Sequence, residues 1–300
     1  MRKFRKKALV FAKETQYGMD AIDAGETATS VLGREMKIMP LAGENTALDY
    51  DNGVLGNSAE IATETYVTLE FGLDWAGSGE ATTHAPYDNL LSACLRQSST
   101  GSGQIERNIH DDSSDSVTFY FYLDGALHAL TGARGNVKVE AKAKSFPTIS
   151  FTFTGLFVAI TAAAIPATNF AAWQTPLKVG AANTACMLDG RAAKLISFEY
   201  DQGNEVQYIE YVGHEEVIIS DYAPSGKIVL EAASLTDFDP FAANTKILEF
   251  ELTHGVAGNT ISFSCNELQL GRAEYGDQDG ILTYEIPIRP IGNSDLLITK

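Results

Sequence analysis

The sequence has few cysteines, and no two of them form a short paired motif. Only Cys94, Cys186 and Cys265 are present, far apart in the chain, and none belongs to a CxxC pair. An odd number of widely separated cysteines predicts free thiols in a reducing compartment rather than a disulfide framework.

Long apolar runs are also missing. A membrane helix needs about 18 consecutive apolar residues, and no run in this chain approaches that length. The basic start MRKFRKK is followed only by a short apolar run at residues 8–12, without a small-residue cleavage pattern. We therefore expect no membrane association and an intracellular origin rather than Sec export.

Cations are scarce beyond the first 13 residues. The net charge is −17 at pH 7, and because residues 1–13 contribute +6, the rest of the chain carries −23. A body this acidic repels nucleic-acid phosphates, which argues against DNA or RNA binding as the main role. The basic start is then a solvated or partner-docking arm, with a nucleic-acid arm as the alternative.

Enzyme signatures are absent: the chain has no GxSxG, P-loop, GxGxxG or HExxH motif. His110-Asp111-Asp112 lies in a polar Gly/Ser-rich segment, which favours a solvated loop over a metal site. Residues 277–280 (DQDG) resemble the start of a calcium loop but lack the bidentate glutamate downstream, which favours a hairpin turn. The sequence therefore predicts no catalysis, no metal and no cofactor.

Residues 117–155 carry the clearest structural pattern. The runs VTFYFYL, NVKVEAK and TISFTFT alternate apolar and polar residues, which is typical of half-buried antiparallel strands. Asp124-Gly125 supplies a turn after the first run, because glycine tolerates the positive φ of a tight reversal. These residues predict a β-meander.

The meander pattern returns near the C-terminus. Its landmarks at 125, 136 and 148 recur at 255, 266 and 281, with His254-Gly255 in the place of Asp124-Gly125. Upstream, residues 37–40, 55–58 and 67–70 match residues 194–197, 212–215 and 228–231. Segments that repeat in the same order at a near-constant offset indicate a tandem duplication.

The duplication predicts a mainly β protein of two tandem domains, each with a short flanking α-helix. We expect a poorly packed N-terminal arm over residues 1–32, a first domain over 33–165 and a second over 166–300. Helices are expected at 87–97, with Asp88 as N-cap, and at 239–245, with Asp239 as N-cap.

Two further segments are predicted to be irregular. Residues 101–116 form a polar surface loop that is present only in the first half. Residues 159–178 form a connector that Trp173 pins to a domain.

Each strand-rich half must protect its sheet edges from uncontrolled pairing. Closure by neighbours is one solution, in which edges pair across subunits of a ring. A duplicated domain supplies two similar edges, as head-to-tail association requires. Three chains of two domains would then give a ring with pseudo-sixfold symmetry.

Several segments together carry a family resemblance: RKKALVFAKETQYGMDA, LDYDNGVLGNSAEI, AGSG…PYDNLLSAC, SVTFYFYLDGALHALTGARGNV, FTFTGLF and EYGDQDGI. In this order the chain resembles phage tail tube proteins, the major tail proteins of long-tailed, non-contractile phages. The resemblance covers almost the whole chain and rests on the order of the segments, not on one motif. It implies β-barrel or sandwich domains whose sheets join around a channel.

The resemblance also implies location and partners. The protein would be a structural part of the virion tail, assembled in the host bacterial cytoplasm into stacked rings of itself. The tape-measure protein would occupy the channel during assembly, and terminator and baseplate or distal tail proteins would cap the ends. Double-stranded DNA would pass through without specific binding. Single-domain family members form hexamers, whereas two domains per chain favour trimers.

By the same resemblance, residues 48–61 and 205–216 are candidate bridging loops and residues 1–32 an inter-ring arm. The candidate contact residues are Phe4, Phe11, Tyr17, Tyr50, Asn52, Leu55, Tyr208, Tyr211 and His214.

Acidic channel walls would let DNA slide, because cationic walls gain affinity through counterion release. The strand carboxylates expected to line the channel are Glu70, Asp74, Glu140, Glu210, Glu249 and Glu285. An outward, solvated position is the alternative for each of them.

A β-sandwich binding module that recognises carbohydrate or a cell-surface receptor is the alternative function. Tyr120 and Tyr122, or Tyr208 and Tyr211, could stack on sugars, although aromatic residues on strands more often pack or form interfaces. A binding module should remain discrete in solution, whereas a tube subunit should polymerise. A hydrolase that uses the Asp-rich segment is a third hypothesis.

Overall fold

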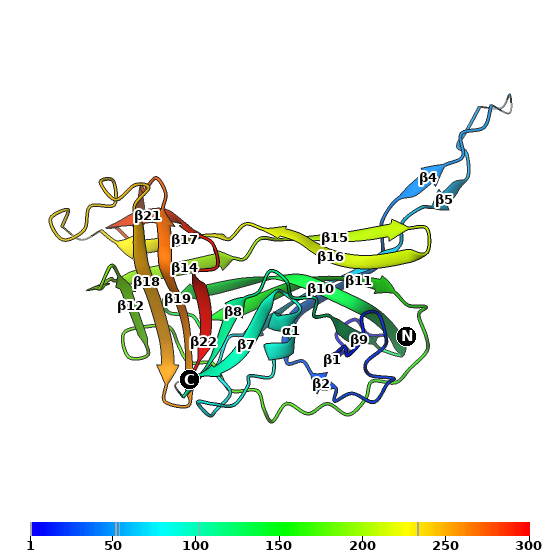
Figure 1. Ribbon diagram of the computed structural model, residues 1–300, viewed down its shortest axis with the longest axis horizontal. Helices are drawn as coiled ribbons and strands as arrows, with labels where there is room; N and C mark the ends of the chain where they lie inside the picture. Colours follow the sequence, from blue (N-terminus) through cyan, green and yellow to red (C-terminus); the bar gives the residue numbers. More distant parts are fainter. Residues whose placement is uncertain (1, 52, 54, 102, 233) are drawn as a thin grey trace.

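The computed structural model describes residues 2–51, 53, 55–101, 103–232 and 234–300, and β-strands dominate it (Figure 1). Strands take up 55% of the residues and helix 2%, so the expected mainly β class is confirmed. No helix in these ranges is long and apolar enough to cross a membrane.

The first half of the chain contains β1 (Lys7–Lys13), β2 (Thr29–Ser30), β3 (Gly33–Ala42), β4 (Asn45–Ala47), β5 (Glu60–Ala62), β6 (Tyr66–Asp74), α1 (Asp88–Ser92), β7 (Arg96–Gly101), β8 (Gln104–Ile109), β9 (Val117–Leu123), β10 (Ala126–Lys142) and β11 (Thr148–Phe157). The second half contains β12 (Thr184–Leu188), β13 (Arg191–Ala192), β14 (Leu195–Asp201), β15 (Asn204–Tyr211), β16 (His214–Tyr222), β17 (Ser225–Glu231), β18 (Ile247–Val256), β19 (Asn259–Leu270), β20 (Glu274–Gln278), β21 (Ile281–Pro290) and β22 (Asp295–Thr299).

The order of strand pairing in the first half is repeated in the second. The first half pairs as β3–β6–β11–β10–β9–β1, and the second as β14–β17–β21–β19–β18–β12. This agreement supports the tandem duplication. One network of paired strands and one apolar core contain residues of both halves. The boundaries at residues 33, 165 and 300 therefore remain a prediction.

The predicted meander is present as β9, β10 and β11. Asp124 and Gly125 make the first turn with φ of 38° and 94°, a conformation that favours Gly and Asp. The corresponding turn in the second half lies at 257–258, not at His254-Gly255, which continue β18. His254 is buried there and contacts Thr184 and the Leu177 carbonyl, so the turn expected at His254-Gly255 is wrong.

The expectation of a poorly packed N-terminal arm is wrong for β1. This strand pairs with β9 along its whole length, and its five central residues are buried. Its sequence ALVFA is apolar at both alternating positions, so both faces are covered. Leu9 and Phe11 face the main core, while Ala8 and Val10 pack with Tyr122.

Residues 101–116 are not a polar surface loop throughout. They include β8, which pairs with β7 and with the C-terminal strand β22. Ile105, Arg107 and Ile109 are buried at every second position of β8. This period-two pattern predicts a strand, but polar residues around it mask the signal.

The helix expectations are only partly met. A short helix, α1, occurs within 87–97, but Asp88 is its first residue rather than the cap, and the Asp88 carboxylate pairs with buried Arg107. Residues 239–245 form turns instead of a second helix. The Asp239 carboxylate does accept hydrogen bonds from the backbone N–H groups of Phe241 and Ala242, as an N-cap would.

Candidate assembly interface

A continuous sheet of β3, β6, β11, β10, β14, β17 and β21 crosses both halves of the chain. Strand alternation gives it one apolar face, which packs into the core, and one polar face. The polar face bears the carboxylates of Glu70, Asp74, Glu140, Glu199, Asp201, Glu231 and Glu285, and the cations of Arg34, Lys37, Lys138, Lys142, Lys194 and Lys227.

Four of the six acids expected in a channel therefore share this polar face: Glu70, Asp74, Glu140 and Glu285. A hollow of about 610 Å³ lies over the first-half part of the face, with Glu70 and Glu140 among its lining residues. The other two acids lie elsewhere. Glu210 is on the β15–β16 hairpin, and Glu249 is on β18, which pairs with β12 and β19.

Most carboxylates on the polar face have a cationic neighbour. Lys37 lies 3.9 Å from Glu70, Arg34 contacts Asp74 at 2.7 Å, and Lys227 pairs with Glu285. Lys138 and Lys194 pair in the same way with Asp201 and Glu231. The face thus carries mixed charge, and it is less negative than the acids alone suggest.

The sheets of the two halves are joined by β10 and β14. The C-terminal part of β10 pairs antiparallel with β14, from Lys138↔Asp201 to Lys142↔Ser197. The Asp201 carboxylate accepts a hydrogen bond from Asn136 at 2.7 Å and forms an ion pair with Lys138 at 2.7 Å. We call this pairing the internal junction.

The internal junction has open counterparts at both ends of the chain. β14 corresponds to β3 in the repeated strand order, and β3 pairs with β6 on one side only. β20 forms a hairpin with β21, as the end of β10 does with β11. In the described part of the chain, β21 is the one strand that pairs with β20. Within the described residues, β3 and β20 therefore offer free edges equivalent to the two strands of the junction.

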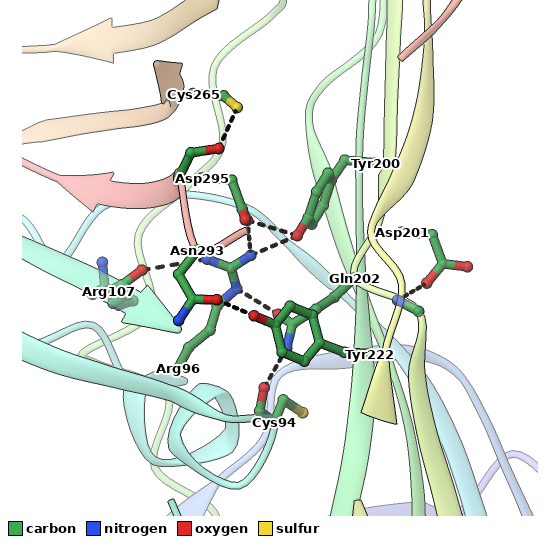
Figure 2. Close-up of polar contacts among 12 residues, drawn as sticks. Cys94, Arg96, Arg107, Tyr200, Asp201, Gln202, Tyr222, Cys265, Asn293 and Asp295 are labelled. Atoms are coloured by element: carbon green, nitrogen blue, oxygen red, sulfur yellow. Dashed lines mark hydrogen bonds and ion pairs between the residues drawn. The ribbon is translucent and has the colours of Figure 1, made fainter. Parts of the chain in front are cut away.

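A buried polar cluster fixes the internal junction to the rest of the chain (Figure 2). Arg96 on β7 pairs with Asp295 on β22, and both side chains are fully buried. Arg96 also donates to the Tyr200 hydroxyl on β14 at 2.7 Å and to the Gln202 side chain at 2.6 Å. Burial raises the pKa of Tyr200 well above its ordinary value, so the hydroxyl stays protonated and donates to Asp295.

The β15–β16 hairpin lies along the first half of the same chain (Figure 1). Tyr208 stacks on Tyr66 with ring centroids 5.3 Å apart. Arg134 on β10 donates to the Val217 carbonyl at 2.6 Å and pairs with Glu216 at 2.9 Å. The hairpin thus holds the two halves together, except at its tip, where Tyr211 and His214 are exposed.

Tyr17 also contributes to this docking. Its hydroxyl accepts the backbone N–H of Val217 at 2.6 Å, and Arg134 lies over its ring at 4.7 Å. Burial raises the pKa of Tyr17 to about 12. Of the predicted contact residues, Tyr17 and Tyr208 therefore already have partners within the subunit, and Phe11 is in its core.

The remaining predicted contact residues that the structure describes are exposed. Phe4 precedes β1, and Tyr50 and Leu55 lie in the loop between β4 and β5. Asn52 lies outside the described residues. Of the tyrosines considered for sugar stacking, Tyr122 is buried, the Tyr120 hydroxyl donates to Asp20 at 2.7 Å, and Tyr208 stacks on Tyr66, whereas Tyr211 is exposed.

The Asp201 carboxylate makes the internal junction sensitive to acid. Burial alone raises its pKa, but hydrogen bonds from Asn136, Lys138 and the Gly203 N–H outweigh burial and lower it below 3.8. A lowered folded-state pKa adds stability above about pH 3.8, and this stability is lost as the pH falls through the folded-state value.

We therefore expect the wild type to lose stability between about pH 5 and about pH 3 more steeply than Asp201→Asn does. Denaturant unfolding at several pH values measures both slopes. Parallel curves for the two proteins would contradict this assignment.

Comparison with known families decides the identity of the chain. A model of the phage tail tube protein family matches residues 5–292, which is nearly the whole sequence. The chain belongs to the phage tail tube protein family. No curated protein matched it. As a tail tube protein, it has a structural role in the tail of a phage virion.

Within the described residues, no group of three or more His, Cys, Asp or Glu could hold a metal ion. Asp279 and Gly280 form the turn between β20 and β21, with φ of 55° and 83°, and the Asp277 carboxylate accepts the Gly280 N–H at 3.0 Å. The predicted hairpin turn is therefore confirmed there.

Sequence reasoning missed the two open edges and the buried Arg96–Asp295 pair. Two strands could have been predicted from the sequence. The continuous apolar run ALVFA indicates β1, and the alternation of Ile105 and Ile109 with polar residues indicates β8. No local signal marks which strand edges remain free, since this depends on pairing between distant segments.

Proposed function

We propose that this tail tube protein is the tube-forming subunit, and that three copies close into a ring with pseudo-sixfold symmetry. The observation that carries the proposal is the internal junction, with its two open counterparts. β20 of one copy pairs with β3 of the next, as β10 pairs with β14 inside each copy. Three internal junctions then alternate with three junctions between copies.

The internal junction also gives the register of the proposed pairing. Glu140 opposes Glu199. When Thr148 on β11 is aligned with Ile281 on β21, Glu140 corresponds to Gln278, since each opposes one of these residues. The pairings of β11 with β6 and of β21 with β17 then align Thr68 with Lys227, and hence Met39 with Glu199, two residues away from the sequence match of 67–70 with 228–231. Gln278 of one copy therefore opposes Met39 of the next.

The polar face of the joined sheet lines the channel in this proposal. Paired carboxylates and cations leave few free cations to bind phosphate, so DNA passes without tight binding. The tape-measure protein occupies the channel during assembly in the host cytoplasm, and terminator and baseplate or distal tail proteins close the ends.

The test is negative-stain electron microscopy of the purified protein over a range of concentrations, with one edge blocked. In an antiparallel hairpin, opposed residues alternate between hydrogen-bonded and non-hydrogen-bonded pairs. Gln278 and Ile281 flank the turn as a hydrogen-bonded pair, so Asp277 and Leu282 are a non-hydrogen-bonded pair and the N–H of Asp277 points away from β21. Asp277→Pro should abolish rings and tubes, because proline cannot donate to the neighbouring strand. Asp277→Thr keeps the N–H and is the matched control.

Circular dichroism must show that the proline variant remains folded. Hollow tubes from wild type and Asp277→Thr, but not from folded Asp277→Pro, support the proposal. Discrete single subunits from the wild type at all concentrations would overturn it. Oxidation of a Met39→Cys, Gln278→Cys variant should yield covalent trimers, and either single variant should not.

A further inference from the structure

Three aromatic side chains pack together beside β20, the strand with a free edge in the second half. Tyr275 on β20, Tyr284 on β21 and Phe241 in the turns between β17 and β18 are here named the aromatic platform. Their centroids are 5.0 Å apart for Phe241 and Tyr275, 5.8 Å for Tyr275 and Tyr284, and 6.0 Å for Phe241 and Tyr284. Each side chain therefore packs on the other two.

One side of the aromatic platform is open within a single copy. Tyr284 is buried, but Tyr275 is 59% exposed and Phe241 is 40% exposed. Tyr275 lies directly opposite Tyr284 across the β20–β21 pair, so both side chains stand on the face of the sheet that packs into the core. The core of the second half thus ends in exposed aromatic side chains at the free edge of β20.

The internal junction shows what covers an edge of this kind. In the alignment of the β10–β11 and β20–β21 hairpins given above, Tyr275 takes the place of Val137. Val137 is fully buried, because β14 continues the sheet beside β10 and the Gln202 N–H donates to the Val137 carbonyl at 3.0 Å. A strand placed on β20 as β14 is placed on β10 would therefore bury Tyr275.

The other strand of the proposed junction between copies is open in the same way. Phe198 and Tyr200, which face the core from β14, are buried at the internal junction. In the same alignment their counterparts on β3 are Ile38 and Pro40, which are partly exposed. Large side chains of β14 thus meet small ones of β10, whereas the large side chain at the open edges is on β20 and the smaller ones are on β3. Large still meets small when β20 pairs with β3.

We infer that the aromatic platform packs against the core-facing side of β3, around Ile38 and Pro40, of a second copy of this chain. This inference rests on the proposed function, and it assigns most of the binding free energy of that junction to the platform. Aromatic side chains dominate interface energetics because each buries a large apolar area. Hydrogen bonds between strand edges add less, because water satisfies the same groups before the edges pair.

Truncation of either exposed aromatic side chain tests this energetic role. Tyr275→Ala and Phe241→Ala should each raise the protein concentration needed for trimeric rings at least about tenfold, because the interface loses a central aromatic contact. Phe170→Ala is the matched control, since Phe170 is 37% exposed and lies in the connector between β11 and β12. It should leave that concentration unchanged. Analytical ultracentrifugation measures assembly, and circular dichroism must show that each variant is folded.

A photo-crosslinking amino acid at the platform identifies what covers it. Replacing Tyr275 with p-benzoylphenylalanine keeps an aromatic side chain, which on irradiation abstracts a hydrogen atom from a nearby C–H group and forms a C–C bond there. In assembled trimeric rings, mass spectrometry should find residue 275 joined to residues 36–42 of another copy. Dilute, unassembled subunits should not yield this crosslink.

Each other outcome overturns a stated part of the argument. Assembly of either alanine variant at wild-type concentrations, or a crosslink from trimeric rings to any other segment, would overturn the platform contact. The ring proposal would survive that result, because the covalent trimers of the Met39→Cys, Gln278→Cys variant report the strand pairing independently. A wild type that forms no trimeric rings would overturn the proposed function itself.

Discussion

Replacing Asp295 with alanine should lower the free energy of unfolding by about 3–5 kcal/mol, because Arg96 is left as a buried, unpaired charge. Both side chains are fully buried, and the pair joins β7 to β22 across 199 residues of sequence. Tyr200 would lose a hydrogen-bond acceptor at the same time. Denaturant unfolding of the unassembled subunit measures the change.

A paired substitution separates the charge effect from packing. Arg96→Met with Asp295→Leu should cost less than Asp295→Ala alone, because no buried charge then lacks a partner. The exposed pair of Lys194 and Glu231 is the matched control, and Glu231→Ala should cost less than about 1 kcal/mol. An Asp295→Ala variant as stable as that control would contradict the structural role of the buried cluster.

Truncating one core phenylalanine in each half should cost about 3–5 kcal/mol per site. Phe119 is fully buried in the first half, with its ring centroid 4.8 Å from that of Phe153. Phe263 is fully buried in the second half, 4.9 Å from Phe198. Because one continuous core joins the halves, Phe119→Ala and Phe263→Ala should both shift a single unfolding transition.

Thermal and denaturant unfolding, each followed by two spectroscopic probes, test this cooperativity. Tyr211→Ala, at an exposed hairpin tip, should leave the transition nearly unchanged. Two separate transitions, with only one shifted by each phenylalanine variant, would show that residues 33–165 and 166–300 unfold as independent domains.

Local patterns predicted the strands of the meander correctly. The alternation in VTFYFYL and TISFTFT gives β9 and β11, because one face of each strand must be apolar to pack on the core. The second predicted helix, at residues 239–245, is absent from the structure. Asp239 and Pro240 are typical of a helix start, yet the following residues form only turns.

The candidate interface was only partly predictable. Four of the expected channel acids share the polar face, because strand alternation fixes the side on which each lies. The cations that pair with them come from neighbouring strands, and a single strand does not reveal its neighbours. Phe11 was expected in a contact but lies in the core, since β9 covers β1.

The sequence by itself determined the mainly β class, the turn at Asp124-Gly125 and the family, and it predicts an internal repeat. Each of these depends on residues close together in the chain, or on the order of segments along it. The tertiary structure alone decided that β10 pairs with β14, that β8 pairs with β22, and that β3 and β20 keep a free edge. Strand partners are chosen by packing and hydrogen bonding between segments far apart in sequence, and alternation within one strand carries no information about which partner it will meet.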